Sequence, residues 1–394
     1  MNGARGAVSI IVPTFNRARY LAATLDSLLA QSEPAAEIIV INDGSTDLTA
    51  NVLAPYRARI ACLQQPNRGK SAALNRGLAQ ASGDYIWVFD DDDVACPDTL
   101  ARHLAVLERR PEIGFTISGS YRCYDDACGA LIIGRAQPVR AFADDEYLFE
   151  LLLSSYVAGP SSIIRRTLLD QVGGFREDLE RAEDFEMALR LGLICQPGRL
   201  DDPRPTYYRR WHRGLRGHAG RQFTFADNTR RSRAAERLVL RDLAPNLSLN
   251  RYLPRTQWDM PQDELGQCRA HLRRWIVAMQ KGLWTEAHTE LAVLCDLEPV
   301  LARLPPADLA WASRAFADSN MLQELATEPD TLRQITNALK SARTARLRRA
   351  GVRQMYYHVR AALGRREPAR VLFMIKMWRA LFGAVGTFAA VVAH

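Results

Sequence analysis

Short apolar runs alternate with amphipathic stretches through the first hundred residues. Four runs are rich in β-branched or aromatic side chains and predict buried strands: residues 8–12, 37–41, 60–64 and 85–89. Three stretches between these strands predict helices: residues 20–31, 46–53 and 70–80. Strands that alternate with helices predict a mostly parallel sheet with helices on both faces. In such a sheet, ligands bind at the carboxyl ends of the strands.

The rest of the chain changes character twice. Residues 112–212 mix strand and helix patterns, whereas residues 229–370 carry a helical periodicity, as in Trp284–Leu294. We therefore expect an α/β domain over residues 1–215 and an all-α C-terminal part. Within that part we expect a helical domain over residues 216–339 and a basic helical segment with an apolar tail over residues 340–394.

Composition excludes several classes of protein. The chain has 394 residues, of which 47% are hydrophobic and 24% charged, so it is not mainly disordered, collagenous or a coiled coil. The seven cysteines include no C-x-x-C pair, so we expect a reducing compartment and no disulfide or zinc framework. Pro13 and Asn16 interrupt the first apolar run, which is therefore not a signal peptide. We expect a cytoplasmic protein.

The strongest chemical signal is an acidic run that directly follows the strand at residues 85–89. It consists of Asp90, Asp91, Asp92 and Asp93. Adjacent carboxylates repel one another, and a hard dication such as Mg²⁺ or Mn²⁺ relieves that repulsion. The alternative is a solvated acidic turn at a helix start, because Asp often caps helices. The alternation of strands and helices around the run favours the metal site.

Two further positions lie at strand or helix ends on the same edge. Asp43 ends the second strand beside Gly44, where it could accept hydrogen bonds from a ribose or a base, or form an Asx turn. Lys70 begins a helix, and a lysine among backbone amides at a helix N-terminus is a candidate anion site. Gln64 occupies the glycine position of a phosphate-binding loop, so that motif is excluded.

Two late positions are also candidates. Glu183 and Asp184 begin an acidic helix, where a carboxylate could act as a general base or could only complement the helix dipole. His212 could bind a metal or a phosphate, although a lone histidine is more often structural. Neither feature is decisive by itself.

Five segments together carry a family resemblance. They are VSIIVPTFN (8–16), EIIVINDGSTD (37–47), NRGKSAALNRG (67–77), GDYIWVFDDDDVACP (83–97) and GGFREDLERAEDFEMALRL (173–191). In this order they resemble the family 2 glycosyltransferases of the GT-A fold, over residues 7–215. The resemblance implies a Rossmann-like, mostly parallel sheet and an inverting transfer of a sugar from a nucleotide diphosphate to a hydroxyl group.

The resemblance also assigns roles to single residues. It implies base and ribose contacts for Pro13, Phe15 and Asp43. Lys70 is implied near the base or diphosphate, with Asn75 supporting the same loop. The acidic run resembles the D-x-D metal motif: Asp92 is the implied direct ligand, Asp90 or Asp91 contacts the ribose or a metal-bound water, and Asp93 could share the role. Further implied roles are a base at Asp184 beside Glu183, a contact to phosphates or metal at His212, and an acceptor side at Ser161 and Ser162.

The resemblance further implies the identity of the ligands. The donor is a nucleotide-sugar, with uridine or thymidine nucleotides favoured, and the cofactor is Mn²⁺ or Mg²⁺. The acceptor is a glycan or a lipid-linked molecule, as in the assembly of cell-surface polysaccharides.

The basic residues are concentrated near the C-terminus. Residues 340–379 contain twelve Lys or Arg residues and one acidic residue, Glu367, and an apolar tail follows them. This pattern predicts peripheral attachment to an anionic membrane, on its inner face. The alternative is a solvated basic face over a buried last helix. Nucleic-acid binding is not expected, because the charge leads into an apolar tail rather than into a groove-reading motif.

Two other functions are weighed against the transferase. A sugar-phosphate nucleotidylyltransferase would need a glycine-rich N-terminal loop with a basic residue, which Val12–Asn16 does not provide. A non-catalytic scaffold could keep the fold and bind partners through its helical region. A scaffold, however, has no need of an acidic run together with Glu183 and Asp184.

Overall fold

The computed structural model describes residues 6–212, 216–218, 221–223 and 225–382. These residues divide into two compact units. The first consists of Met1–Tyr147 and Ser154–Glu236, and the second of Leu148–Leu153 and Arg237–His394. The tail beyond Phe382, on which the expectation of an apolar end rests, lies outside the described residues.

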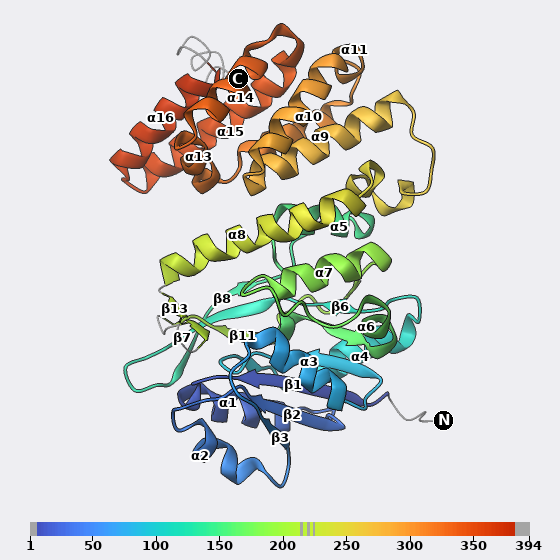
Figure 1. The fold of residues 1–394 in the computed structure, drawn as a ribbon, viewed down its shortest axis with the longest axis vertical. Helices are drawn as coiled ribbons and strands as arrows, with labels where there is room; N and C mark the ends of the chain where they lie inside the picture. Colours follow the sequence, from blue (N-terminus) through green and yellow to red (C-terminus); the bar gives the residue numbers. More distant parts are fainter. Residues whose placement is uncertain (1–5, 213–215, 219–220, 224, 383–394) are drawn as a thin grey trace. The chain divides into compact units, whose positions relative to one another are not determined.

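The first unit is built on a five-stranded sheet with the order β3-β2-β1-β4-β9 (Figure 1). Its strands are β1 (Val8–Thr14), β2 (Glu37–Asn42), β3 (Ala61–Gln64), β4 (Tyr85–Val88) and β9 (Ile163–Arg165). The first four are parallel, and β9 pairs with β4 antiparallel. The α/β fold expected from the alternating pattern is therefore confirmed.

Helices cover both faces of this sheet. Successive side chains of β1 point to opposite faces and pack against different helices. Ile10 belongs to the core cluster that contains Leu25 of α1 and Leu104 of α4, whereas Ile11 faces Gly77 of α3. The helices of this unit are α1 (Ala18–Leu29), α2 (Thr49–Leu53), α3 (Lys70–Gln80), α4 (Thr99–Arg109), α6 (Arg166–Val172) and α7 (Glu183–Ile194).

One predicted helix begins later than expected. The sequence predicts a helix over residues 46–53, but α2 begins at Thr49. The amides of Thr46 and Asp47 instead donate to Oδ1 of Asn16, at 2.8 and 3.3 Å. A side chain that competes for backbone amides in this way delays the start of a helix.

A second, four-stranded sheet has the order β5-β11-β7-β8. Its strands are β5 (Val94–Ala95), β7 (Ser120–Asp125), β8 (Leu131–Gln137) and β11 (Tyr207–Arg210). β11 runs antiparallel to β5, which directly follows the acidic run, and parallel to β7. The remaining strands form two short pairs: β6 (Thr116–Ile117) with β10 (Gly198–Arg199), and β12 (Arg216–His218) with β13 (Arg221–Phe223).

The second unit, coloured mainly from yellow to red in Figure 1, is helical, as the sequence predicts. Its aromatic core includes Phe316, whose ring centroid lies 5.9 Å from that of Trp275 and 5.3 Å from that of Phe382. A buried ion pair joins Glu150 of α5 to Arg314 through two contacts of 2.6 and 2.8 Å. In sequence, the boundary between the units falls after Tyr147 in α5 and after Glu236 in α8. The helices are α5 (Tyr147–Leu153), α8 (Phe225–Leu243), α9 (Glu264–Lys281), α10 (Trp284–Asp296), α11 (Glu298–Leu301), α12 (Pro306–Trp311), α13 (Ser319–Ala326), α14 (Pro329–Lys340), α15 (Ala345–Gly364) and α16 (Pro368–Phe382).

We expect Gly77→Val to destabilise the first unit. A Cβ atom at this position would clash with Cγ2 of Ile11 and would lie 2.8 Å from Cδ1 of Ile41, in the buried contact of α3 with β1 and β2. Such overpacking costs about 1–3 kcal/mol of unfolding free energy. Urea unfolding of the two proteins measures the difference. The control is Ala79→Val at an exposed position of α3, and equal destabilisation by both variants would contradict the tight packing of α3.

Candidate active site

A pocket of about 270 Å³ opens where the carboxyl ends of β1, β2 and β4 meet α3 and the segment before α7. The acidic run, Asp43 and Lys70 all contribute to its wall. Nineteen residues line the pocket: Pro13, Thr14, Phe15, Arg17, Asp43, Asn67, Arg68, Gly69, Lys70, Ser71, Ala73, Asp90, Asp91, Asp92, Glu177, Leu179, Glu180, Arg181 and Glu183. The structure therefore brings these candidates together at one edge of the sheet.

The acidic run divides between the pocket and the interior. Asp90, Asp91 and Asp92 line the pocket, whereas Asp93 is 3% exposed and accepts a hydrogen bond of 2.9 Å from the amide of Arg210. The hydroxyl of Thr24 donates to the backbone carbonyls of Asp91 and Asp93, at 3.1 and 2.7 Å. These contacts fix the turn and direct three carboxylates, rather than four, to the pocket.

Two groups outside the run reach its carboxylates. Nε2 of His212 lies 2.9 Å from Oδ2 of Asp92, and Nε of Arg17 lies 3.8 and 3.9 Å from Asp91 and Asp92. Burial and the charge of Asp92 raise the pKa of Asp91 to about 7, although Arg17 opposes the shift. The positive charge near the acidic run therefore neutralises its carboxylates only in part.

Lys70 joins the acidic run to the start of α7. Its Nζ lies 2.9 Å from Oδ1 of Asp90, 2.9 Å from Oε1 of Glu183 and 3.8 Å from Oδ2 of Asp184. Burial lowers the pKa of Lys70, but the three carboxylates outweigh it and raise that pKa well above its ordinary value. Lys70 is therefore a fixed cation that holds two distant parts of the chain together.

Glu183 and Asp184, the first two residues of α7, differ in their tendency to ionise. Burial raises the pKa of Glu183, but the charge and hydrogen bond of Lys70 lower it overall. Burial and the charges of Glu183 and Asp90 raise the pKa of Asp184 to about 7, despite Lys70 and a hydrogen bond from the amide of Gly159. A carboxylate that titrates near neutral pH, beside one that stays ionised, is typical of a general base.

The backbone in front of these residues is strained. Ala182 has a φ of +65°, in the left-handed region that residues with a Cβ rarely adopt. Strain of this kind is found at functional sites when the surrounding structure enforces it. Here the strained residue directly precedes the first turn of α7, which carries the carboxylates that contact Lys70.

Asp43 shapes the pocket rim as well as lining it. It is 3% exposed, and its Oδ1 accepts hydrogen bonds from Nε2 of Gln65 and the amide of Arg68, at 2.7 and 2.9 Å. Its Oδ2 accepts one from the amide of Gly69, also at 2.9 Å. Gly69 has a φ of +90°, which a side chain would strain. Asp43 therefore holds the loop that leads into Lys70, a role that the sequence does not reveal.

The other candidates have varied positions. Pro13 and Phe15 line the pocket, whereas Asn75 does not. The amide of Asn75 instead clamps Phe175: Nδ2 donates to its carbonyl at 2.8 Å, and Oδ1 accepts from its N–H at 2.7 Å. This clamp positions the segment that carries Glu177, whose Oε1 also accepts from Nδ2 at 3.0 Å.

The two serines expected on the acceptor side are buried. The hydroxyl of Ser161 donates to the carbonyl of Ala158 at 2.7 Å and closes the short turn before β9. The hydroxyl of Ser162 has no hydrogen-bond partner among the described residues. Both lie outside the pocket wall.

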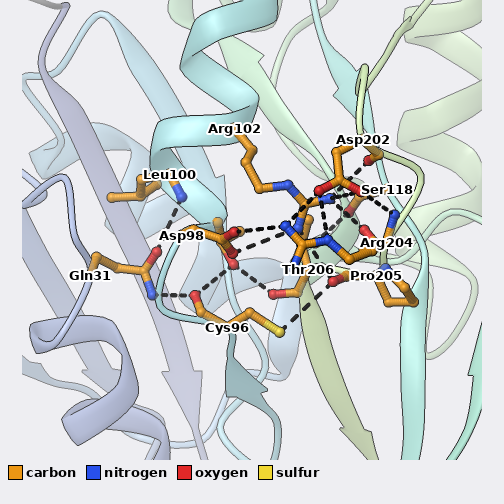
Figure 2. Close-up of polar contacts among 11 residues, drawn as sticks. Gln31, Cys96, Asp98, Leu100, Arg102, Ser118, Asp202, Arg204, Pro205 and Thr206 are labelled. Atoms are coloured by element: carbon orange, nitrogen blue, oxygen red, sulfur yellow. Dashed lines mark hydrogen bonds and ion pairs between the residues drawn. The ribbon is translucent and has the colours of Figure 1, made fainter.

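A polar network places β11, and with it His212, beside the acidic run. Figure 2 shows that Arg102 of α4 donates to the backbone carbonyls of Asp202 and Pro205, at 2.8 and 3.4 Å. The adjacent Thr206 carbonyl accepts from the hydroxyl of Thr99 at 2.6 Å. Arg210 then donates through Nε to the carbonyl of Asp92 at 2.8 Å. Sequence reasoning missed Arg102 and Arg210, because their partners lie far along the chain.

Comparison with known proteins connects this site to a family. Residues 9–173 match the model described as "Glycosyl transferase family 2". Over these residues, the α/β unit is similar to the family 2 glycosyltransferases. The match covers less than half of the chain and ends before Glu183, so the roles of Glu183, Asp184 and His212 rest on the geometry described above.

Several known glycosyltransferases are similar to parts of this chain. An uncharacterized glycosyltransferase of Rickettsia prowazekii is 30% identical over 182 residues, which is 46% of this chain and 57% of that protein. One of Haemophilus influenzae is 27% identical over 187 residues, or 47% and 61%. The chain thus spans little more than half the length of these relatives. The crystal structure of S. aureus TarS 1–349 gives a TM-score of 0.49 at 21% identity, over 82% of this chain and 88% of that one.

We expect Asp184→Asn to stabilise the protein more strongly at pH 8 than at pH 5. The unfolded chain ionises Asp184 near its ordinary pKa of 3.8, whereas the folded protein does so near 7. The wild type therefore loses stability as the pH rises between these values, and Asn removes the loss. Melting temperatures at pH 5 and pH 8 measure the effect. The control is Asp201→Asn, in an exposed pair with Arg109, and a shift for Asp184→Asn that is the same at both pH values would contradict the raised pKa.

Proposed function

We propose that the protein is an inverting glycosyltransferase that moves a sugar from a nucleotide-diphosphate donor to a hydroxyl acceptor. One observation carries the proposal: Lys70 brings Asp90 of the acidic run and Glu183 and Asp184 of α7 to one ammonium group. The charged groups needed to bind a diphosphate and to activate a hydroxyl group therefore lie side by side. The family of the domain supports the same reaction.

The donor would occupy the pocket between β1, β2 and β4. Pro13, Phe15 and Asp43 line its inner wall and would contact the base and ribose. Arg17 and Lys70 lie beside the acidic run and would face the diphosphate. Uridine and thymidine nucleotides are the expected donors, on the family resemblance alone.

A divalent cation, Mn²⁺ or Mg²⁺, fits the oxygen-rich edge of this pocket. Among the described residues, no three His, Cys, Asp or Glu side chains are arranged to hold a metal ion. Mg²⁺, however, is usually held by one or two carboxylates together with substrate phosphates. Asp92 and His212, 2.9 Å apart, would provide the protein ligands, with Asp90 or Asp91 nearby. The ion would neutralise charge on the diphosphate leaving group.

Asp184 would act as the base. Its carboxylate takes the proton of the acceptor hydroxyl while that oxygen forms a bond to the anomeric carbon. The bond from that carbon to the diphosphate oxygen breaks, and the diphosphate leaves with the electron pair. Attack from the face opposite the diphosphate inverts the anomeric centre. Burial, together with the charge of Glu183 that Lys70 holds ionised, keeps the pKa of Asp184 near neutral.

Nucleotide binding is the first test of this function. Calorimetric titration of UDP, GDP, TDP and CDP, each with and without Mn²⁺, should show metal-dependent binding of one nucleotide, with UDP or TDP expected. Absence of binding by all four, in protein shown to be folded, would overturn the proposal.

Two variants should separate donor binding from catalysis. We expect Asp92→Ala to abolish the effect of Mn²⁺ on nucleotide affinity. We expect Asp184→Asn to keep that affinity and to lower turnover by about 10²–10⁴-fold, the usual contribution of a general base. Calorimetry and donor-hydrolysis or transfer assays measure the two effects, with Asp201→Asn as the surface control. Near-normal turnover of Asp184→Asn would remove its role.

We also propose that the second unit binds an anionic membrane surface. No described helix is long and apolar enough to cross a bilayer. Helix α15, however, exposes a stripe of four arginines around Tyr357, and none of the four pairs with an acidic residue that the structure describes. The stripe consists of Arg346, Arg349, Arg353 and Arg360. Unpaired guanidinium groups on one helix face are suited to anionic headgroups. A lipid-linked acceptor would match this location.

We expect the double variant Arg349→Gln with Arg353→Gln to weaken binding to anionic liposomes roughly 30-fold at low salt, since each basic residue near the surface contributes about 1 kcal/mol. The charge-matched control replaces Arg303 and Arg333, which lie near Glu264 and Asp330. Liposome sedimentation measures the affinity. If the wild type ignores liposomes of phosphatidylserine, or if both double variants bind equally, the proposal fails.

A further inference from the structure

One face of the second sheet continues from the catalytic residues and carries two arginines. β11 and β7 are parallel neighbours, and their register places Arg209 beside Arg122. Side chains two residues apart on a strand share a face. The face that carries Arg209 therefore also carries Tyr207 at its start.

Tyr207 connects this face to the acidic run. Its ring is buried and meets the ring of Phe89 edge-on, with the centroids 6.5 Å apart. Phe89 directly precedes Asp90. Arg209, two residues beyond Tyr207, is exposed, and the charges of Asp93, Asp90 and Asp184 act on it. Arg209 therefore occupies an exposed position of β11 at which these carboxylates act through their charge.

Neither Arg122 nor Arg209 forms a hydrogen bond or ion pair through its side chain with a described residue. Arg122 instead lies over the ring of Trp211, with Cζ 3.6 Å from the ring centroid. Arg210 provides a contrast, because its side chain points to the other face and pairs with Asp125. The carboxylates of Asp93, Asp90 and Asp184 act on Arg209 through their charge but form no ion pair with it. An anionic ligand would give these two adjacent guanidinium groups direct partners.

The same face offers aromatic surface beyond the arginines. Tyr124 of β7 lies two residues past Arg122 and is 41% exposed. A Cβ atom on Gly134 of β8 would lie 3.4 Å from the Tyr124 ring, so the ring covers this glycine. Flat, rigid rings of this kind offer contact area to a ligand that reaches past the guanidinium groups.

We propose that Arg122 and Arg209, together with Trp211 and Tyr124, form an acceptor subsite for a glycan that carries anionic groups. The proposal rests on the proposed function, since it takes Asp184 as the base. Arg209 would bind an anion close to the reacting hydroxyl, and Arg122 a second anion farther along the acceptor. Guanidinium groups bind both phosphate and carboxylate oxygens through paired hydrogen bonds. The shared chemistry is therefore an acidic oxygen group repeated along the acceptor.

Saturation-transfer NMR with three tetrasaccharides tests the subsite without measuring transfer. The probes are neutral maltotetraose, phosphorylated maltotetraose and tetragalacturonate, each in the presence of excess UDP and Mn²⁺ to fill the donor pocket. We expect at least one anionic probe to bind roughly tenfold or more tightly than maltotetraose. Its identity separates a phosphate from a carboxylate preference. Equal binding of all three, or binding of none, would overturn the proposal.

Variants show whether the preference arises at this face. We expect Arg122→Gln with Arg209→Gln to abolish the preference for the anionic probe, while UDP affinity and the melting temperature stay unchanged. Arg209→Lys should restore part of it, because the charge remains and the paired donors are lost. The control replaces Arg109 and Arg110, which lie near Asp201 and Glu112. An unchanged preference in the double Gln variant would refute the subsite.

Failure of the subsite and failure of the proposed function give different results. Nucleotide binding with no anion preference refutes only the subsite. Anion preference that depends on Arg122 and Arg209, without binding of any nucleotide, refutes the donor site and leaves an anionic-glycan-binding face.

Discussion

The site depends on one ammonium group held among three carboxylates. Asp90, Glu183 and Asp184 all lie within 4 Å of Nζ of Lys70. Without that charge, the start of α7 would carry two acidic side chains toward an acidic run that is already repulsive. Lys70 can hold this position because Asp43 fixes the preceding loop through the amides of Arg68 and Gly69. The pocket rim and the carboxylates at the start of α7 are therefore parts of one arrangement.

This arrangement also sets the electrostatic condition for ligand binding. A diphosphate brings further negative charge to a pocket in which Asp91 already has a raised pKa. Arg17 lies almost 4 Å from both neighbouring carboxylates and neutralises them only in part. Under the proposed function, the donor must therefore arrive with a dication or must draw Lys70 toward its phosphates. The first alternative leaves Lys70 in place to hold Glu183 ionised.

The sequence predicts those features that depend on local pattern. Buried strands and amphipathic helices follow from hydrophobic period, and the order of strands and helices places Asp43, Lys70 and the acidic run at one edge. It does not predict that Asp93 turns inward, because four identical residues carry no signal of direction. The amide of Arg210, from a strand far along the chain, decides that orientation. The clamp of Asn75 on Phe175 is equally non-local.

Two neighbouring arginines on β11 show most clearly what the sequence alone does not predict. Arg209 and Arg210 are adjacent residues of the same type, so no motif distinguishes one from the other. Strand geometry sends their side chains to opposite faces. One face holds Asp125 and the carbonyl of Asp92, which bind Arg210 and fix the strand. The other face leads from Tyr207 to Arg209, which is exposed and forms no ion pair with a described residue. A single residue of register therefore decides which arginine fixes the strand and which one belongs to the proposed acceptor subsite.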